Sequence, residues 1–193
     1  MEATLMPLVQ TTLRQPRLAA EMIMGLGLKR DVLWTALALG AALHALVLQL
    51  VLSVSEPAMP LPGYMSMPLV LFVLIAGVMV IYVHALHWAA RALGGKGELW
   101  DMLAVIVWLQ LLRATAQLIL LVVSLAMPLL GMVLALVVGV WGLWILFNFI
   151  AAAGRLPTAG HGIAVVVMAA VGLVLGLSIF LSLIGLSAQG VPS

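Results

Sequence analysis

Arg113 is the first candidate for a functional role, because its charged side chain lies inside a long apolar stretch. Gln110 precedes it by three residues and Gln117 follows it by four, so in a helix the three side chains share one face. An arginine at the centre of a membrane span costs roughly 2.5 to 3.5 kcal/mol, so we expect it to have partners. If the next apolar stretch folds back as a hairpin, Trp141 comes level with Arg113 and can stack on its guanidinium.

This polar stripe has two interpretations. It could bind an anion or another substrate in a small transporter or channel subunit. It could instead join helices by hydrogen bonds, which average about 0.6 kcal/mol each in membranes. No Asp or Glu lies within a predicted span, so a carboxylate relay for protons is not expected. We favour the structural interpretation.

Two histidines, His84 and His87, are three residues apart, a spacing that can present both imidazoles to a metal. A third ligand would have to come from Glu98, Asp101 or His161, and no pattern in the sequence fixes their approach. We therefore expect packing and hydrogen bonding at these histidines, and no metal site.

The remaining enzymatic motifs are absent from the sequence. The segment Gly94-Gly95-Lys96-Gly97 lacks the spacing and the Ser or Thr of a phosphate-binding loop, so it predicts a tight turn. There is no His-Glu-x-x-His motif, and the chain has no cysteine. We expect no enzymatic activity, no cofactor and no nucleic-acid partner.

Hydropathy predicts the helices in which these residues lie. The chain is 66% hydrophobic and 7% charged, with a mean hydropathy of +1.32, whereas a soluble domain carries roughly 25% charged residues. A membrane-spanning helix needs about 20 mainly apolar residues. The sequence predicts an all-α polytopic membrane protein, a bundle of about five transmembrane helices, with spans at about 32–54, 67–90, 102–126, 128–153 and 163–186.

Basic residues predict the orientation of these spans, because Lys and Arg concentrate on the cytoplasmic side. They occur before the first span, between the second and third, and between the fourth and fifth: Arg14, Arg17, Lys29, Arg30, Arg91, Lys96 and Arg155. We expect an inner-membrane protein with its N-terminus in the cytoplasm and residues 187–193 as a short periplasmic tail.

Residues 1–31 form a separate cytoplasmic segment in this interpretation. They lack the pattern of a cleavable signal peptide, so the first span is expected to stay attached. Pro16 suits the first turn of a helix, and an apolar face follows that ends near Gly25. We predict a short amphipathic helix at the membrane interface, with basic side chains towards lipid headgroups, namely Arg14, Arg17, Lys29 and Arg30, joined by Lys96 from the inner loop between the second and third spans.

Small residues recur at four-residue spacing on the last two spans. They are Gly131, Ala135 and Gly139 in the fourth span, and Gly172 and Gly176 in the fifth. Small side chains let membrane helices approach closely. We expect packing within the bundle, with self-association through the fifth span as the alternative.

The layout of five spans, the basic N-terminal helix, and the loop Gly94-Gly95-Lys96-Gly97 leading into Trp108-Leu109-Gln110 resembles bacterial members of the Yip-domain family. Eukaryotic relatives in that family bind Rab-type GTPases and take part in vesicle formation and membrane shaping. Their cytosolic Asp-Leu-Tyr-Gly-Pro motif is missing here, so the GTPase role is not carried over.

The resemblance implies a non-enzymatic membrane protein that organises the membrane or engages lipids and proteins. Membrane lipids are the expected partners, together with other membrane proteins or a second copy of the chain. A small transporter or channel subunit that uses the Arg/Gln stripe is the alternative.

Overall fold

The structure is a computed structural model that describes residues 2–54, 63 and 67–183. Within these residues the chain forms seven helices and no strand. Five of the helices are long and apolar enough to cross a membrane, which confirms the predicted all-α membrane fold. Most of the predicted outer loop at 55–66 and the tail at 187–193 lie outside the described residues. The helices are α1 (Glu2–Arg14), α2 (Pro16–Gly25), α3 (Arg30–Val54), α4 (Pro68–Ala92), α5 (Leu99–Ala126), α6 (Pro128–Ala153) and α7 (Ala159–Leu183).

Local sequence explains where the helices begin. Pro16, Pro68 and Pro128 occupy first-turn positions of α2, α4 and α6, where the fixed φ of proline suits a helix and its missing N–H costs nothing. Helix α5 begins after Glu98, which forms a capping box with Asp101. The α5 helix therefore starts three residues before the predicted apolar span, because polar capping residues extend a helix beyond its hydrophobic stretch.

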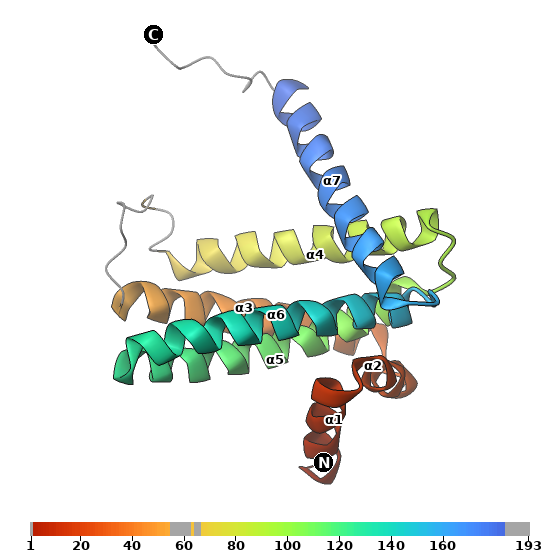
Figure 1. Cartoon of the computed structure of the whole chain (residues 1–193). Coiled ribbons are helices and arrows are strands. Elements are labelled where there is room, and N and C mark those ends of the chain that lie inside the picture. Colours follow the sequence, from red (N-terminus) through yellow and green to blue (C-terminus); the bar gives the residue numbers. More distant parts are fainter. Residues whose placement is uncertain (1, 55–62, 64–66, 184–193) are drawn as a thin grey trace.

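The helix α1 was not predicted from the sequence, where only the segment that forms α2 was expected to be helical. Figure 1 shows α1 and α2 at one end of the bundle, with α1 running away from the long helices. Pro7 lies inside α1, and the Thr11 hydroxyl donates to the Pro7 carbonyl oxygen at 2.8 Å.

The long helices α3 to α6 lie side by side, with α5 packed against both α3 and α6 (Figure 1). Helix α7 packs on α4 and α6 near its first residues and then diverges steeply from the bundle (Figure 1). Three helix ends on the same side of the bundle form what we call the charged end: the start of α3, the α4–α5 turn and the α6–α7 turn. Helix α2 packs there on α5 and α6.

The protein core lies towards the charged end. Consecutive residues Met102–Val107 of α5 and Phe149–Ala153 of α6 are buried, which requires protein on every side of both helices. The other half of the α5–α6 hairpin exposes large apolar side chains, among them Val122 and Leu129, which is 78% exposed. Such a continuous apolar surface needs lipid around it.

Candidate functional site at the charged end

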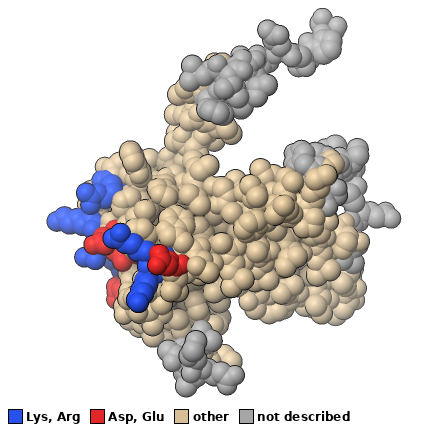
Figure 2. Space-filling model, turned by 180° about the vertical axis from the view of Figure 1, so that it is seen from behind, with Lys and Arg blue, Asp and Glu red and all other residues tan. Residues whose placement is uncertain are grey.

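Charged side chains gather at one end of the molecule, as Figure 2 shows for one of its faces. Arg113 apart, every charged side chain that the structure describes belongs to α1, to α2, or to a helix end or turn at the charged end. The long helices thus have an apolar part and a charged end, as expected for membrane-spanning helices whose charged residues lie at one membrane surface.

Backbone hydrogen bonds lock the two turns of this end together. The Lys96 and Gly97 amides donate to the Gly154 carbonyl oxygen at 3.1 and 3.3 Å. This contact brings the Gly97 backbone against Ala153, where a Cβ atom would overlap the Ala153 carbonyl. The glycine-rich segment therefore forms the predicted turn, and it docks on the end of α6.

Arg17 ties α2 to the same region. Its guanidinium donates to the carbonyl oxygens of Pro157 and Leu156 at 2.7 and 2.8 Å. The sequence assigned Arg17 to lipid headgroups, but the structure directs it to the turn between α6 and α7. Carbonyl oxygens left free after a helix end attract a cation, which gives this contact its physical reason.

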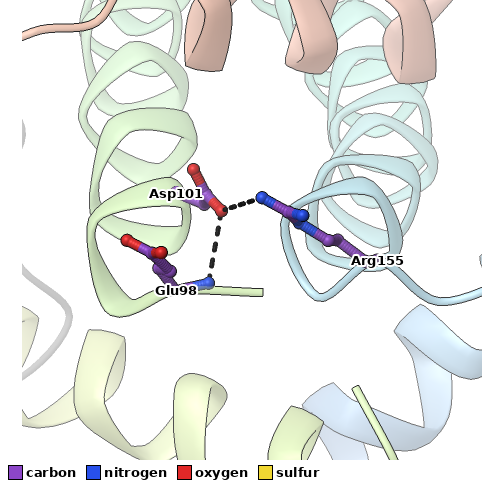
Figure 3. A network of polar contacts seen from close by, with 3 residues as sticks. All are labelled: Glu98, Asp101 and Arg155. Atoms are coloured by element: carbon purple, nitrogen blue, oxygen red, sulfur yellow. Dashed lines mark hydrogen bonds and ion pairs between the residues drawn. The ribbon is translucent and has the colours of Figure 1, made fainter. Parts of the chain in front are cut away.

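A polar network links α5 to the end of α6 (Figure 3). The Glu98 amide donates to Asp101 Oδ2 at 3.2 Å, and Arg155 Nη2 lies 3.6 Å from the same oxygen. Arg155 has a φ of 54°, in the left-handed region that favours glycine. The Leu156 amide donates to Ala151 O at 2.8 Å, so Arg155 occupies the position at which many helices end in glycine.

The other basic residues assigned to lipid have mixed positions. Arg30 lies over the Trp100 ring, with Cζ 4.3 Å from the ring centroid. The side chains of Arg14, Lys29 and Lys96 are exposed. These three remain available to headgroups, and their lipid contact stays a prediction.

Two tryptophans from the bundle hold the end of α1. Trp108 Nε1 donates to the hydroxyl of Thr12, a fully buried residue, at 3.1 Å. Trp141 Nε1 donates to the Leu13 carbonyl oxygen at 3.2 Å, and its ring meets Trp144 edge to face. The polar atom of Trp141 is therefore directed to α1, a role that the sequence did not suggest because the hydrogen-bond partners are more than a hundred residues apart.

The proposed stripe around Arg113 is not assembled as a unit. Gln110 is buried and its amide donates to the Met79 sulfur. Gln117 is half-buried, whereas Arg113 is exposed and makes no hydrogen bond or ion pair with any described residue. Among the described residues, the only cation found over an aromatic ring is Arg30, so Arg113 and Trp141 are not brought together.

The histidines do not converge on a metal position. Among the described residues no three His, Cys, Asp or Glu side chains lie close enough to hold an ion. His84 Nδ1 lies 2.7 Å from the Val80 carbonyl oxygen, and its ring stacks on Trp34. His161 instead contacts the Thr158 hydroxyl at 2.8 Å.

The small residues divide into two groups. A Cβ on Gly131 would collide with Ser124, so this glycine permits the close approach of α5 and α6. Gly139, Gly172 and Gly176 have nothing within 4 Å of such an atom, and Ala135 is exposed. Within the described part of one chain, therefore, no other helix packs closely against these glycines. Self-association remains a prediction for α7.

Tight glycine contacts occur at a place that the sequence analysis did not single out. A Cβ on Gly162 would overlap the Phe147 carbonyl, where α7 crosses α6. In the sequence, Gly162 is only a glycine near the polar start of an apolar stretch. This pattern does not show which helix α7 will cross.

Comparison with known proteins agrees with this architecture. A family model described as the Yip1 domain matches residues 11–181. No curated protein and no solved structure matches the chain. The matched region runs from the end of α1 into α7 and so includes the charged end and all five candidate spans, and the chain belongs to the Yip1 domain family.

Proposed function

We propose that this protein organises lipids or partner proteins at its charged end, as a non-enzymatic protein of a cell's inner membrane. The charged end and the N-terminus lie in the cytoplasm in this proposal, and the C-terminus lies in the periplasm. The observation that carries the proposal is that α2 has three different sides. One side of this helix packs on the bundle, and another exposes a row of apolar side chains.

The three sides of α2 follow from the helical period of about 100° per residue. One side is buried against the bundle and consists of Pro16, Ala19, Ala20 and Ile23. A second side carries Arg17 and Glu21, which line a cleft of about 560 Å³ at the charged end. The third side is an exposed apolar row with a spacing of four: Leu18, Met22 and Leu26. An exposed apolar row beside basic residues is typical of a helix lying in one membrane leaflet.

Helix lengths also support a position of the charged end at the inner surface of the membrane. From the uncharged turn at Met127, about 20 residues are needed to cross about 30 Å of hydrocarbon, which leads to Val107 on α5 and Phe147 on α6. Trp108 and Trp144 then lie at the inner boundary, where indole rings are favoured. The hydrogen bond between Trp108 and Thr12 supports a position of the end of α1 at that depth. Both short helices would occupy space in the inner leaflet alone, a geometry that responds to membrane curvature.

The test uses the absence of cysteine, which allows single-cysteine labelling of the full chain. An environment-sensitive dye at Met22→Cys should be quenched by lipid-bound nitroxide in anionic vesicles. The same dye at Glu21→Cys, one residue away on the polar side, should be quenched by aqueous iodide. Aqueous quenching at both positions would overturn the proposal. If the placement holds, vesicles carrying the chain should also change in diameter compared with vesicles carrying a chain that lacks residues 2–25.

The transporter alternative needs the polar stripe to open onto a substrate path. The Gln110 amide donates to the Met79 sulfur and Trp141 donates to Leu13, and Arg113 forms no hydrogen bond or ion pair with a described residue. These contacts favour the lipid-organising function.

A further inference from the structure

An apolar groove of about 620 Å³ runs along the outer side of α6. Its walls are Leu136, Val137, Val140, Trp141 and Trp144. In the placement argued above, the groove runs from about the middle of the hydrocarbon, at Leu136, to just beneath the inner headgroups, at Trp144. The groove therefore spans the depth of a phospholipid acyl chain in the inner leaflet.

The α1 helix adjoins the groove at this boundary. Trp141 is both a wall of the groove and the donor to the Leu13 carbonyl oxygen at 3.2 Å. The next residue, Arg14, is exposed and forms no hydrogen bond or ion pair with a described residue. The exposed Arg14 thus follows directly in the chain after the residue that binds Trp141, one wall of the apolar groove.

The start of α2 adds hydrogen-bond donors at the same junction. Pro16 has no amide hydrogen, and the Gln15 side chain does not cap the helix. The amides of Arg17 and Leu18 in the first turn therefore lack an intrahelical acceptor. Free amides at a helix start and a nearby arginine are the groups that bind a phosphate.

We propose that this junction of α1, α2 and α6 binds one anionic phospholipid. An acyl chain lies in the α6 groove, and the phosphate lies between Arg14 and the first turn of α2. The inference rests on the proposed function, because it names the lipid class and the position at which the charged end holds it. Charge complementarity selects an anionic lipid over a zwitterionic one, since the latter adds a cation that Arg14 repels.

Tryptophan fluorescence includes a signal from the groove, because two of the six tryptophans of the chain, Trp141 and Trp144, are walls of it. The full chain is placed in phosphatidylcholine nanodiscs that contain a minor fraction of lipid with brominated chains. Brominated phosphatidylglycerol should quench more strongly than the same fraction of brominated phosphatidylcholine. Arg14→Gln should reduce this preference about fivefold, the effect of one basic residue near a membrane surface. The control Lys29→Gln removes another exposed charge from the same membrane surface and should lower the preference less than Arg14→Gln.

Two further measurements sharpen the test. Trp144→Phe should lower the quenchable fluorescence, and Val137→Phe should lower the lipid preference by filling the groove. Soluble glycerol phosphate should not relieve quenching, because it has no acyl chain, and relief by it would overturn the lipid assignment. Equal quenching by both lipids would overturn the site. If the Met22→Cys label still reported lipid in that case, the proposed function would stand and this inference alone would fail.

Discussion

At the scale of single residues, Arg155 occupies a backbone conformation that disfavours a side chain. A non-glycine residue in the left-handed region costs roughly 1 to 2 kcal/mol. Its ion pair with Asp101 offsets little, because the Arg155 side chain is 64% exposed and exposed pairs contribute about 0 to 1 kcal/mol. The residue is therefore kept at a net cost to stability.

We predict that Arg155→Gly leaves the protein as stable as the wild type or more stable by up to about 1 kcal/mol. Arg155→Ala retains the backbone penalty and loses the ion pair, so it should be less stable than the wild type. Thermal unfolding in detergent, followed by circular dichroism, would compare them. A glycine variant that melts well below the wild type would show that the ion pair outweighs the backbone penalty.

The glycines give a second prediction at this scale. Gly97→Ala places a methyl group onto the Ala153 carbonyl, and shifting two locked backbones should cost about 1 to 3 kcal/mol. Gly139→Ala meets nothing within 4 Å and serves as the matched control in the same bundle. The melting temperature should fall for Gly97→Ala alone. Equal effects of the two substitutions would contradict the close contact between the turns.

Arg113 is exposed and forms no hydrogen bond or ion pair with a described residue, so its removal should not disturb the fold. We predict that Arg113→Gln keeps near-normal melting behaviour, because it removes a charge that is costly within a span. Gln110→Leu is the informative comparison, because it removes the buried side-chain amide that donates a hydrogen bond to the Met79 sulfur. A strong loss of stability in Arg113→Gln would show that the arginine joins helices after all.

At the scale of elements, the attachment of α1 depends on two long-range hydrogen bonds. Trp108→Phe leaves the Thr12 hydroxyl without its donor, a change worth about 0.5 to 1.5 kcal/mol. We predict faster amide exchange across α1, with the exchange of α5 and α6 unchanged. Trp88→Phe alters the most exposed tryptophan and should leave α1 unaffected. Uniform exchange changes over the whole chain would contradict a local attachment.

At the scale of the whole molecule, five crossings would put the two ends of the chain on opposite sides of the membrane. We predict that a cysteine at Lys96 is labelled by an impermeant maleimide from the cytoplasmic side only. A cysteine at Ser193 should be labelled from the periplasmic side only. Labelling of both from one side would mean an even number of crossings. Labelling of each from the opposite side would invert the orientation argued from the basic residues.

The sequence by itself determined the number and type of the long helices, because twenty apolar residues in a row have few other stable states. It also located the α2 helix through Pro16 and Gly25, since both act on local backbone geometry. The helix α1 escaped prediction, because its end is held by Trp108 and Trp141 rather than by local signals.

Only the tertiary structure decided which polar groups meet. Sequence spacing correctly placed Gln110 and Arg113 one helical turn apart, but the partner of Gln110 is Met79 on α4, and that of Trp141 is Leu13 on α1. Likewise, Arg17 carries the same charge as Arg14 yet bonds to the α6–α7 turn. Periodicity fixes the face of a helix on which a residue lies, whereas the neighbour of that face depends on how the helices pack together.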